Sequence, residues 1–190
     1  MRHMSKTLLL PVCTVALLAI CVPHSACAQH AEEAAEEGAH HEVSLLLAHT
    51  HLSSGVAADG SHKWVVLPSW GINYNYWINP HWAVGLHTDI ITESFVVKSD
   101  LHGGEEEVTE RSHPVAPAIM ATFRPHHHLA FILGAGEELA KEGNLFLVRA
   151  GAEYSIHISG PWETSGSLAY DFRFNAYDSW TLAFGIARGF

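Results

Sequence analysis

The chain has 190 residues, of which 48% are hydrophobic and 16% charged, and its formal net charge is −10 with histidine neutral. This length is enough for one domain. The acidic balance argues against nucleic acid as a partner, because the phosphate backbone is bound mainly through lysine and arginine.

The first 28 residues have the pattern of a secretory signal peptide. Arg2 and Lys6 form a basic start, residues 8–22 are almost entirely apolar, and Ala26-Cys27-Ala28 is a small-x-small cleavage site. We expect cleavage after Ala28. Lipidation of a cysteine is the alternative, but neither Cys21 nor Cys27 has the small and aliphatic residues before it that a lipidation site needs.

Removal of this segment changes the composition. All three cysteines leave with it, so a mature chain of about 160 residues has neither a disulfide nor a thiolate metal site. Lys and Arg fall from ten to eight against twenty Asp and Glu, so the formal charge becomes −12. After residue 28 no apolar run reaches the length of a membrane-spanning helix, which leaves a β-barrel as the form that could span a membrane.

Residues 29–42 are rich in glutamate, alanine and histidine and carry no large apolar side chain. Such a segment cannot join a hydrophobic core, so we predict a disordered leader or a frayed short helix.

Apolar segments of ten to fifteen residues then alternate with polar breaks. They predict eight strands, at 43–52, 63–77, 82–97, 111–124, 128–138, 145–157, 163–175 and 179–190. Three breaks are tight turns, at 79–81, 125–127 and 159–161, and the intervening links include the acidic segment 98–110. Short turns at one end and longer loops at the other are typical of outer-membrane barrels, with the turns in the periplasm.

The last strand shows how the two faces differ. One parity carries large apolar groups, such as Leu182 and Phe184, and the other carries small or weakly polar groups, such as Thr181 and Ala183. This pattern predicts lipid outside and a crowded lumen inside. A soluble barrel with the same alternation would instead bury the aromatic face, and it remains the alternative.

Aromatic side chains gather near the strand ends, as two interfacial girdles would. The expected periplasmic girdle contains Tyr74, Tyr76, Trp82, Trp162 and Phe190, and the outer one contains Trp64, Phe174 and Trp180.

The terminal aromatic Phe190, with Gly185 five residues before it, resembles the C-terminal insertion signal of bacterial outer-membrane barrels. Arg188 departs from that signal, which usually has a second aromatic there. With the eight strands over 43–190, the chain resembles the small eight-stranded outer-membrane β-barrel proteins, and within them an uncharacterised subgroup with a histidine-rich leader. The resemblance implies an all-β, antiparallel up-and-down transmembrane barrel in a Gram-negative outer membrane. It also implies a periplasmic C-terminus, and outer-membrane lipid and the barrel-assembly machinery as partners. It does not imply any catalytic activity.

Charged side chains on the small-residue faces are the first candidate site. We predict a lumen network made of the following residues: His87, Asp89, Glu93, Arg149, Glu153, Asp171 and Arg173. Because an eight-stranded barrel is only wide enough for side chains to fill, these charges are expected to pair and plug it, which argues against a general diffusion pore. A narrow polar path or an internal cation site is the alternative.

Histidines are the second candidate. The predicted metal ligands gather at the periplasmic end: His30, His40, His41, His81, His126, His127 and His128. Neutral imidazole suits zinc, copper or nickel, and Glu36, Glu37 and Glu42 would add oxygen ligands. The alternative is that these histidines are solvated turn residues.

Two further functions stay open. His157-Ile158-Ser159 followed by Asp171 is similar to the His-x-Ser pattern of an outer-membrane lipid deacylase family, but it lies at a periplasmic turn. The acidic segment 98–110, with Glu105–Glu107, would suit a surface adhesin or a cation-binding loop. A structural or binding role, with divalent metal as its ligand, is the main prediction, and catalysis is not expected.

Overall fold

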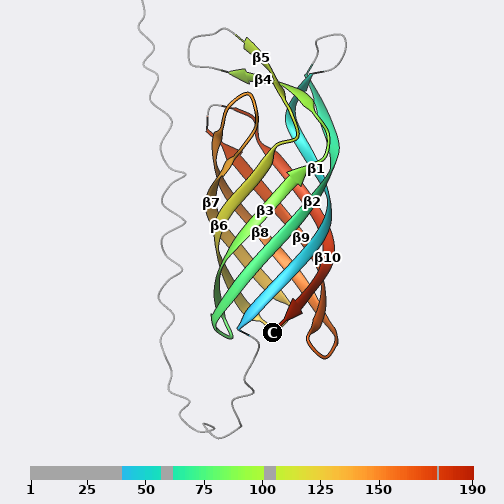
Figure 1. Cartoon of the computed structure of the whole chain (residues 1–190), viewed down its shortest axis with the longest axis vertical. Helices are drawn as coiled ribbons and strands as arrows, with labels where there is room; N and C mark the ends of the chain where they lie inside the picture. The colour runs from blue at the N-terminus through green and yellow to red at the C-terminus, as the bar shows by residue number, and fades with distance from the viewer. Residues whose placement is uncertain (1–39, 57–61, 101–105, 175) are drawn as a thin grey trace, which may run out of the picture. The chain divides into compact units, whose positions relative to one another are not determined.

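The computed structural model describes residues 40–56, 62–100, 106–174 and 176–190 (Figure 1). The predicted signal peptide and most of the predicted leader, including His30, lie outside these residues. The strands are β1 (His41–Val56), β2 (His62–Asn79), β3 (Trp82–Ile91), β4 (Phe95–Asp100), β5 (Glu106–Arg111), β6 (Val115–His126), β7 (Leu129–Glu138), β8 (Leu145–Ser159), β9 (Trp162–Arg173) and β10 (Ser179–Gly189). No helix long and apolar enough to span a membrane occurs in this part of the chain.

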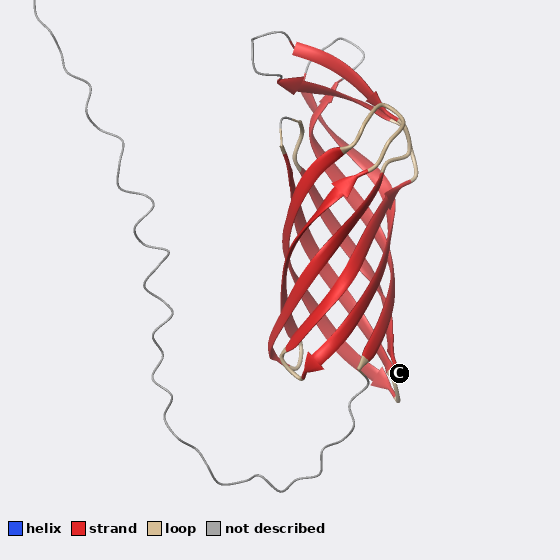
Figure 2. Ribbon diagram, turned by 60° about the vertical axis from the view of Figure 1, so that its left-hand side comes forward, coloured by secondary structure: helices blue, strands red, loops and turns tan. Residues whose placement is uncertain are grey.

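Eight of the strands form a closed antiparallel barrel in the order β1-β2-β3-β6-β7-β8-β9-β10, and β10 pairs with β1 to close it (Figure 2). Each strand pairs with its neighbours along the barrel, as the alternating pattern predicts. The unit that holds the barrel is Glu37–Phe190.

The stagger of the barrel follows from its register. Successive paired residues lead once around the wall, through Glu42, Asn75, Gly85, Met120, Gly134, Arg149, Asp171, Ser179 and Leu52. The path leaves β1 at Glu42 and returns to β1 at Leu52, so the shear is 52 − 42 = 10 residues. Eight strands with this shear tilt by roughly 40° from the barrel axis.

The two faces of the strands are oriented as a membrane barrel requires. Large apolar side chains point outward, so that Phe184 is 63% and Ile119 74% exposed. Alanine, serine, threonine and charged residues point into the lumen; Ala183 and Thr181, for example, are buried. In a soluble barrel the polar face would point outward, and the described wall has the opposite arrangement. The side chains of both predicted aromatic girdles are exposed or half-exposed at the strand ends.

The links between strands also alternate as predicted. The tight turns β2–β3, β6–β7 and β8–β9 lie at the same end of the barrel as Phe190, which we call the turn end (Figure 1). The opposite end of the barrel, where β7 ends and β8 begins, is the loop end. His41 and Phe190 exchange backbone hydrogen bonds at the turn end. Because of this pairing, β1 begins two residues before the predicted boundary, and His41 and Glu42 belong to the barrel instead of the leader.

One predicted strand is too long. The segment expected as 82–97 ends at Ile91, whose backbone N–H donates to the carbonyl of Pro114. Proline has no N–H to continue this ladder, so pairing with β6 stops after Ile91, while Thr92 still donates to the carbonyl of Pro68 in β2. Part of the expected loop 98–110 instead forms the hairpin β4–β5, which projects at the loop end and joins β1 at Gly55.

An apolar cluster covers the lumen at the loop end. Its buried members are Leu52, Leu67, Ile91, Phe95, Val97 and Tyr177. Phe95 and Val97 come from β4, so the base of the hairpin packs into the barrel mouth.

Candidate functional site

Glu138, at the end of β7, is the centre of a buried group of charges below this apolar cluster. Its side chain has no exposed surface. Arg111 donates to Oε1 from Nε at 3.0 Å and from Nη2 at 2.6 Å, and Arg173 donates to Oε2 at 2.6 Å. The Tyr177 hydroxyl lies 2.7 Å from both carboxylate oxygens. Both oxygens of this carboxylate therefore accept hydrogen bonds from buried donors.

Arg149 is the second centre. Its guanidinium contacts both oxygens of Asp171, at 2.7 and 2.8 Å, and also Asp89 at 2.8 Å. Arg173 joins the two centres, because its Nη2 lies 3.4 Å from Asp171 while its Nε binds Glu138. Two-pronged pairing of arginine with a carboxylate is among the strongest polar contacts in proteins.

We call these six residues the ion cluster: Asp89, Arg111, Glu138, Arg149, Asp171 and Arg173. Three arginines face three carboxylates, so its formal charge is zero. Such pairing offsets the cost of burying charge in a lumen shielded from water. A cavity of about 10 Å³ remains beside Asp89, Glu138 and Asp171, which is room for about one water molecule. The lumen is closed at this level.

The structure places the predicted lumen residues unevenly. Asp89, Arg149, Asp171 and Arg173 come together in the ion cluster, and His87 and Glu153 face the lumen nearer the turn end. Glu93 is a correction: it lies exposed in the link after Ile91, because β3 ends before it. Arg111 and Glu138 were missed. Glu138 shares a strand face with Ile132, Gly134 and Gly136, and this parity was the available signal.

A separate chain of polar contacts runs toward the turn end. His87 Nε2 donates to Asn75 Oδ1 at 2.9 Å, and Asn75 Nδ2 donates to Glu42 at 3.1 Å. Glu42 also accepts from Trp77 Nε1 at 3.2 Å and lies 3.6 Å from Arg124. The guanidinium of Arg124 stands 3.9 Å above the Trp77 ring, so these two side chains partly fill the mouth.

The predicted histidine ligands lie around the turn end, but they contact different groups. His40 Nδ1 donates to the carbonyl of Trp77, His81 Nδ1 to that of Arg124 and His128 Nδ1 to that of Ser155. His41 is bonded to the Tyr74 hydroxyl and stacks on Phe190. His126 and His127 are exposed.

Within the described ranges, no group of three His, Cys, Asp or Glu side chains lies close enough to hold a metal. Metal binding that uses the leader, including His30, stays a prediction.

The deacylase-like triad does not assemble. His157 pairs with Glu163 across the β8–β9 hairpin, and Asp171 lies eight residues further along β9. At 3.3 Å per residue this separates His157 from Asp171 by roughly 26 Å. Asp171 is instead bound to Arg149 inside the lumen.

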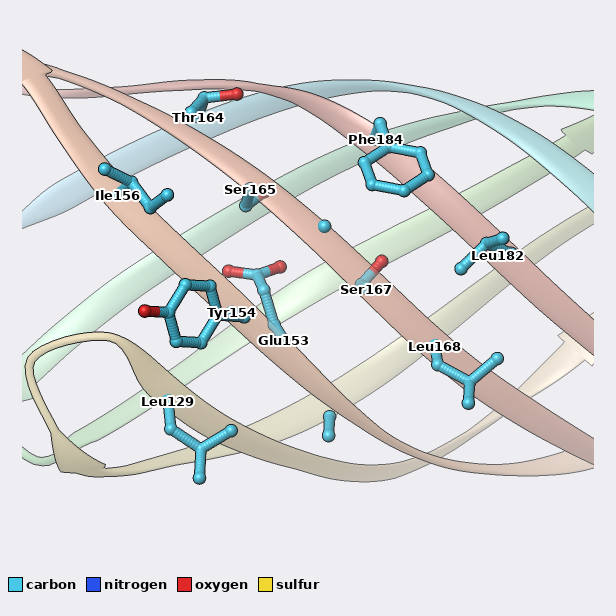
Figure 3. Close-up of a pocket in the computed structure, with 12 residues that line it drawn as sticks. Leu129, Glu153, Tyr154, Ile156, Thr164, Ser165, Ser167, Leu168, Leu182 and Phe184 are labelled. Carbon is cyan, nitrogen blue, oxygen red and sulfur yellow. The ribbon is translucent and has the colours of Figure 1, made fainter.

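The outer wall carries a groove of about 450 Å³ over β8, β9 and β10 (Figure 3). Its floor includes Gly166, and Tyr154, Leu168, Leu182 and Phe184 surround it. All four are on the outward, apolar face, so the groove belongs to the surface that would contact lipid.

The hairpin β4–β5 is fastened to a neighbouring loop as well as to the lumen. The Ser112 hydroxyl donates to Glu142 Oε1 at 2.7 Å and the Ser112 backbone N–H donates to Oε2 at 3.2 Å. The hydrogen bond from the hydroxyl lowers the pKa of Glu142 below its usual value. Arg111 Nη1 donates to the carbonyl of Gly143 in the same loop.

Comparison with known proteins shows likeness of structure. No family model matches the chain, and no curated protein sequence matches it. Among solved structures it is similar to Ail, the attachment invasion locus protein of Yersinia pestis, at 15% identity and a TM-score of 0.50, over 79% of this chain and 97% of that one. It is also similar to the outer membrane protein OprG from Pseudomonas aeruginosa, at 11% identity and a TM-score of 0.57, over 80% of this chain and 97% of that one. The chain thus has the fold of the small eight-stranded outer-membrane β-barrels.

Proposed function

We propose that this chain is a Gram-negative outer-membrane β-barrel with a closed lumen, and that its role is structural or binding. The observation that carries the proposal is the inverted distribution of side chains. Large apolar residues cover the outside of the wall, while six charged side chains, five of them buried, pair inside it. This arrangement would be unstable in water, because it would expose a wide apolar surface. It is stable where lipid replaces water around the wall.

Orientation follows from the same reasoning. We place the turn end and Phe190 in the periplasm and the loop end outside the cell, because such barrels have short periplasmic turns and longer outer loops. Gly185 and Phe190 would then serve the insertion machinery, and Phe190 is 62% exposed at the barrel end.

The closed lumen supports a role other than general diffusion. The ion cluster and the apolar cluster above it follow one another along the axis, and both are buried. The histidine-rich leader remains our candidate for divalent metal binding. Deleting residues 30–39, which lie before β1, should remove its transition-metal affinity without unfolding the barrel.

A second candidate function is binding at the cell surface. The observation that favours it is the hairpin β4–β5, which projects beyond the wall and is fixed at its base by Arg111. Its exposed residues include Val108 and Glu110. Replacing residues 101–105 with a short neutral turn would leave this base intact, and loss of adhesion to a cell or matrix surface would support the candidate.

Membrane fractionation combined with gel mobility tests the main proposal. We expect the protein in the outer-membrane fraction, with an electrophoretic mobility that changes on heating, and no steady conductance in planar bilayers. A soluble periplasmic protein without a mobility shift would contradict the membrane assignment, and large steady conductance would contradict the closed lumen.

A further inference from the structure

The lumen nearer the turn end has a different charge balance from the ion cluster. We call it the lower lumen; it is lined by Glu42, Asn73, Thr122, Glu153 and Ser165. The charged groups that act on Glu153 are Glu42, Glu163 and Arg124. Three carboxylates thus face one arginine, which leaves a formal charge of −2 where the ion cluster has zero.

Glu153 has no partner within the described part of the chain. No hydrogen bond or ion pair joins its carboxylate to another described side chain, although it points inward from β8. Glu42, by contrast, accepts two hydrogen bonds and lies beside Arg124. Glu153 is half-buried, and Arg124 acts on its carboxylate without pairing with it, so the protein's own residues balance this charge only in part.

Three neutral oxygen atoms in the same region are also unpaired. Asn73 Oδ1, Thr122 Oγ1 and Ser165 Oγ are buried and, like the Arg124 Nε–H donor, have no hydrogen-bond partner among the described residues. These side chains are only 7%, 3% and 5% exposed. Leaving such a group unsatisfied costs about 1–3 kcal/mol each, and so native proteins normally supply a partner.

The register brings these oxygens to one level. A shear of ten over eight strands offsets level residues by a little more than one position from strand to strand. With this offset, the Cα atoms of Asn73, Thr122 and Ser165 lie within roughly 4 Å of one another along the axis, and that of Glu153 lies between them. They come from β2, β6, β9 and β8, which surround the lumen, so their inward side chains converge.

Small residues occupy most of the neighbouring lumen positions, namely Ser44, Gly85, Gly151, Ser167 and Gly185, and Ile132 is the large apolar side chain at this level.

We propose that the lower lumen binds one hydrated divalent cation of the magnesium class, centred on Glu153. Because no group of three described carboxylate or imidazole side chains is close enough to ligate a metal directly, the cation would keep its water shell. Magnesium gives up its waters reluctantly and typically takes only one or two carboxylates. The shell waters direct their protons outward, where the oxygens of Asn73, Thr122 and Ser165 would accept them.

Magnesium titration of the purified full-length protein tests this proposal. The protein is first stripped with a chelator and held in a zwitterionic detergent, and magnesium chloride alone is titrated calorimetrically. We expect one saturable site with a Kd of about 10⁻⁴ to 10⁻³ M, as for weak oxygen sites. Glu153→Gln should weaken binding at least tenfold. Glu137→Gln, which removes an exposed carboxylate of β7, should leave it unchanged.

A second variant keeps the test valid if Glu153→Gln folds poorly. Thr122→Val removes one unpaired hydroxyl with little change of shape. It should weaken magnesium binding about threefold, while stability without magnesium stays equal or rises. The proposal is overturned if the wild type shows no saturable binding, which would mean that water alone fills the lower lumen. It is also overturned if Glu137→Gln weakens binding and the lumen variants do not.

Discussion

Replacing Glu138 by glutamine should destabilise the barrel strongly. The substitution keeps the shape of the side chain but removes the charge that Arg111, Arg173 and Tyr177 contact at 2.6–3.0 Å. Arg111 and Arg173 would then remain in the buried cluster with one carboxylate fewer to balance their charge. Breaking a buried ion pair from one side costs about 3–5 kcal/mol, so we expect the free energy of unfolding to fall by that amount.

The neighbouring Glu137 provides a matched control, because it lies on the same strand and is exposed. Glu137→Gln should change the free energy of unfolding by less than about 0.5 kcal/mol. Urea unfolding of the barrel in lipid vesicles, followed by tryptophan fluorescence, measures both variants. With a slope of about 2 kcal/mol per molar urea, the Glu138→Gln midpoint should fall by roughly 2 M. Equal midpoints for the two variants would refute the view that Glu138 holds the upper lumen together.

Three other expectations follow from single contacts. Gly185→Ala should slow or prevent folding in vesicles, because its Cβ would clash with the backbone oxygen of Leu45 in β1. Gly166→Ala should fold, because its Cβ meets only the Phe184 ring, at 3.0 Å, and equal folding yields for the two variants would contradict this. Ser112→Ala should raise the pKa of Glu142 toward its ordinary value in an NMR titration, since the Ser112 hydroxyl lowers that pKa. In the wild type, this hydrogen bond stabilises the fold at pH values above the ordinary pKa of Glu142, and the stabilisation is lost as the pH falls through the lowered pKa. Arg149→Ala should lower the free energy of unfolding in lipid vesicles by about 3–5 kcal/mol, because Asp89 and Asp171 lose this arginine, and an unchanged urea midpoint would contradict the pairing.

The sequence predicts the wall well because a strand's side chains alternate strictly between two faces. Leu182 and Phe184 point outward and Thr181 and Ala183 inward, as their parity requires. Local register also follows from turns. The β8–β9 turn is centred near Gly160, which places Arg149 opposite Asp171, and these two residues form an ion pair.

Local sequence patterns do not predict contacts that depend on the closure of the whole barrel. Glu138 meets Arg111 and Arg173 because β5 folds back into the mouth and because the wall has a shear of ten. Neither feature has a local pattern in the sequence. Glu93 was misplaced for the same reason, since the strand before it ends where Pro114 stops the ladder.

The accessibility of single spin labels on β10 and the hairpin tests the central claim most directly. A chain that begins at Gln29 has no cysteine, so labels can be placed singly at Leu182→Cys in the wall and Glu110→Cys at the loop end. We predict that, in vesicles, the label at position 182 collides mainly with lipid-soluble oxygen and the label at position 110 mainly with a water-soluble nickel chelate. Frequent collision of the chelate with position 182 would contradict a wall that faces lipid.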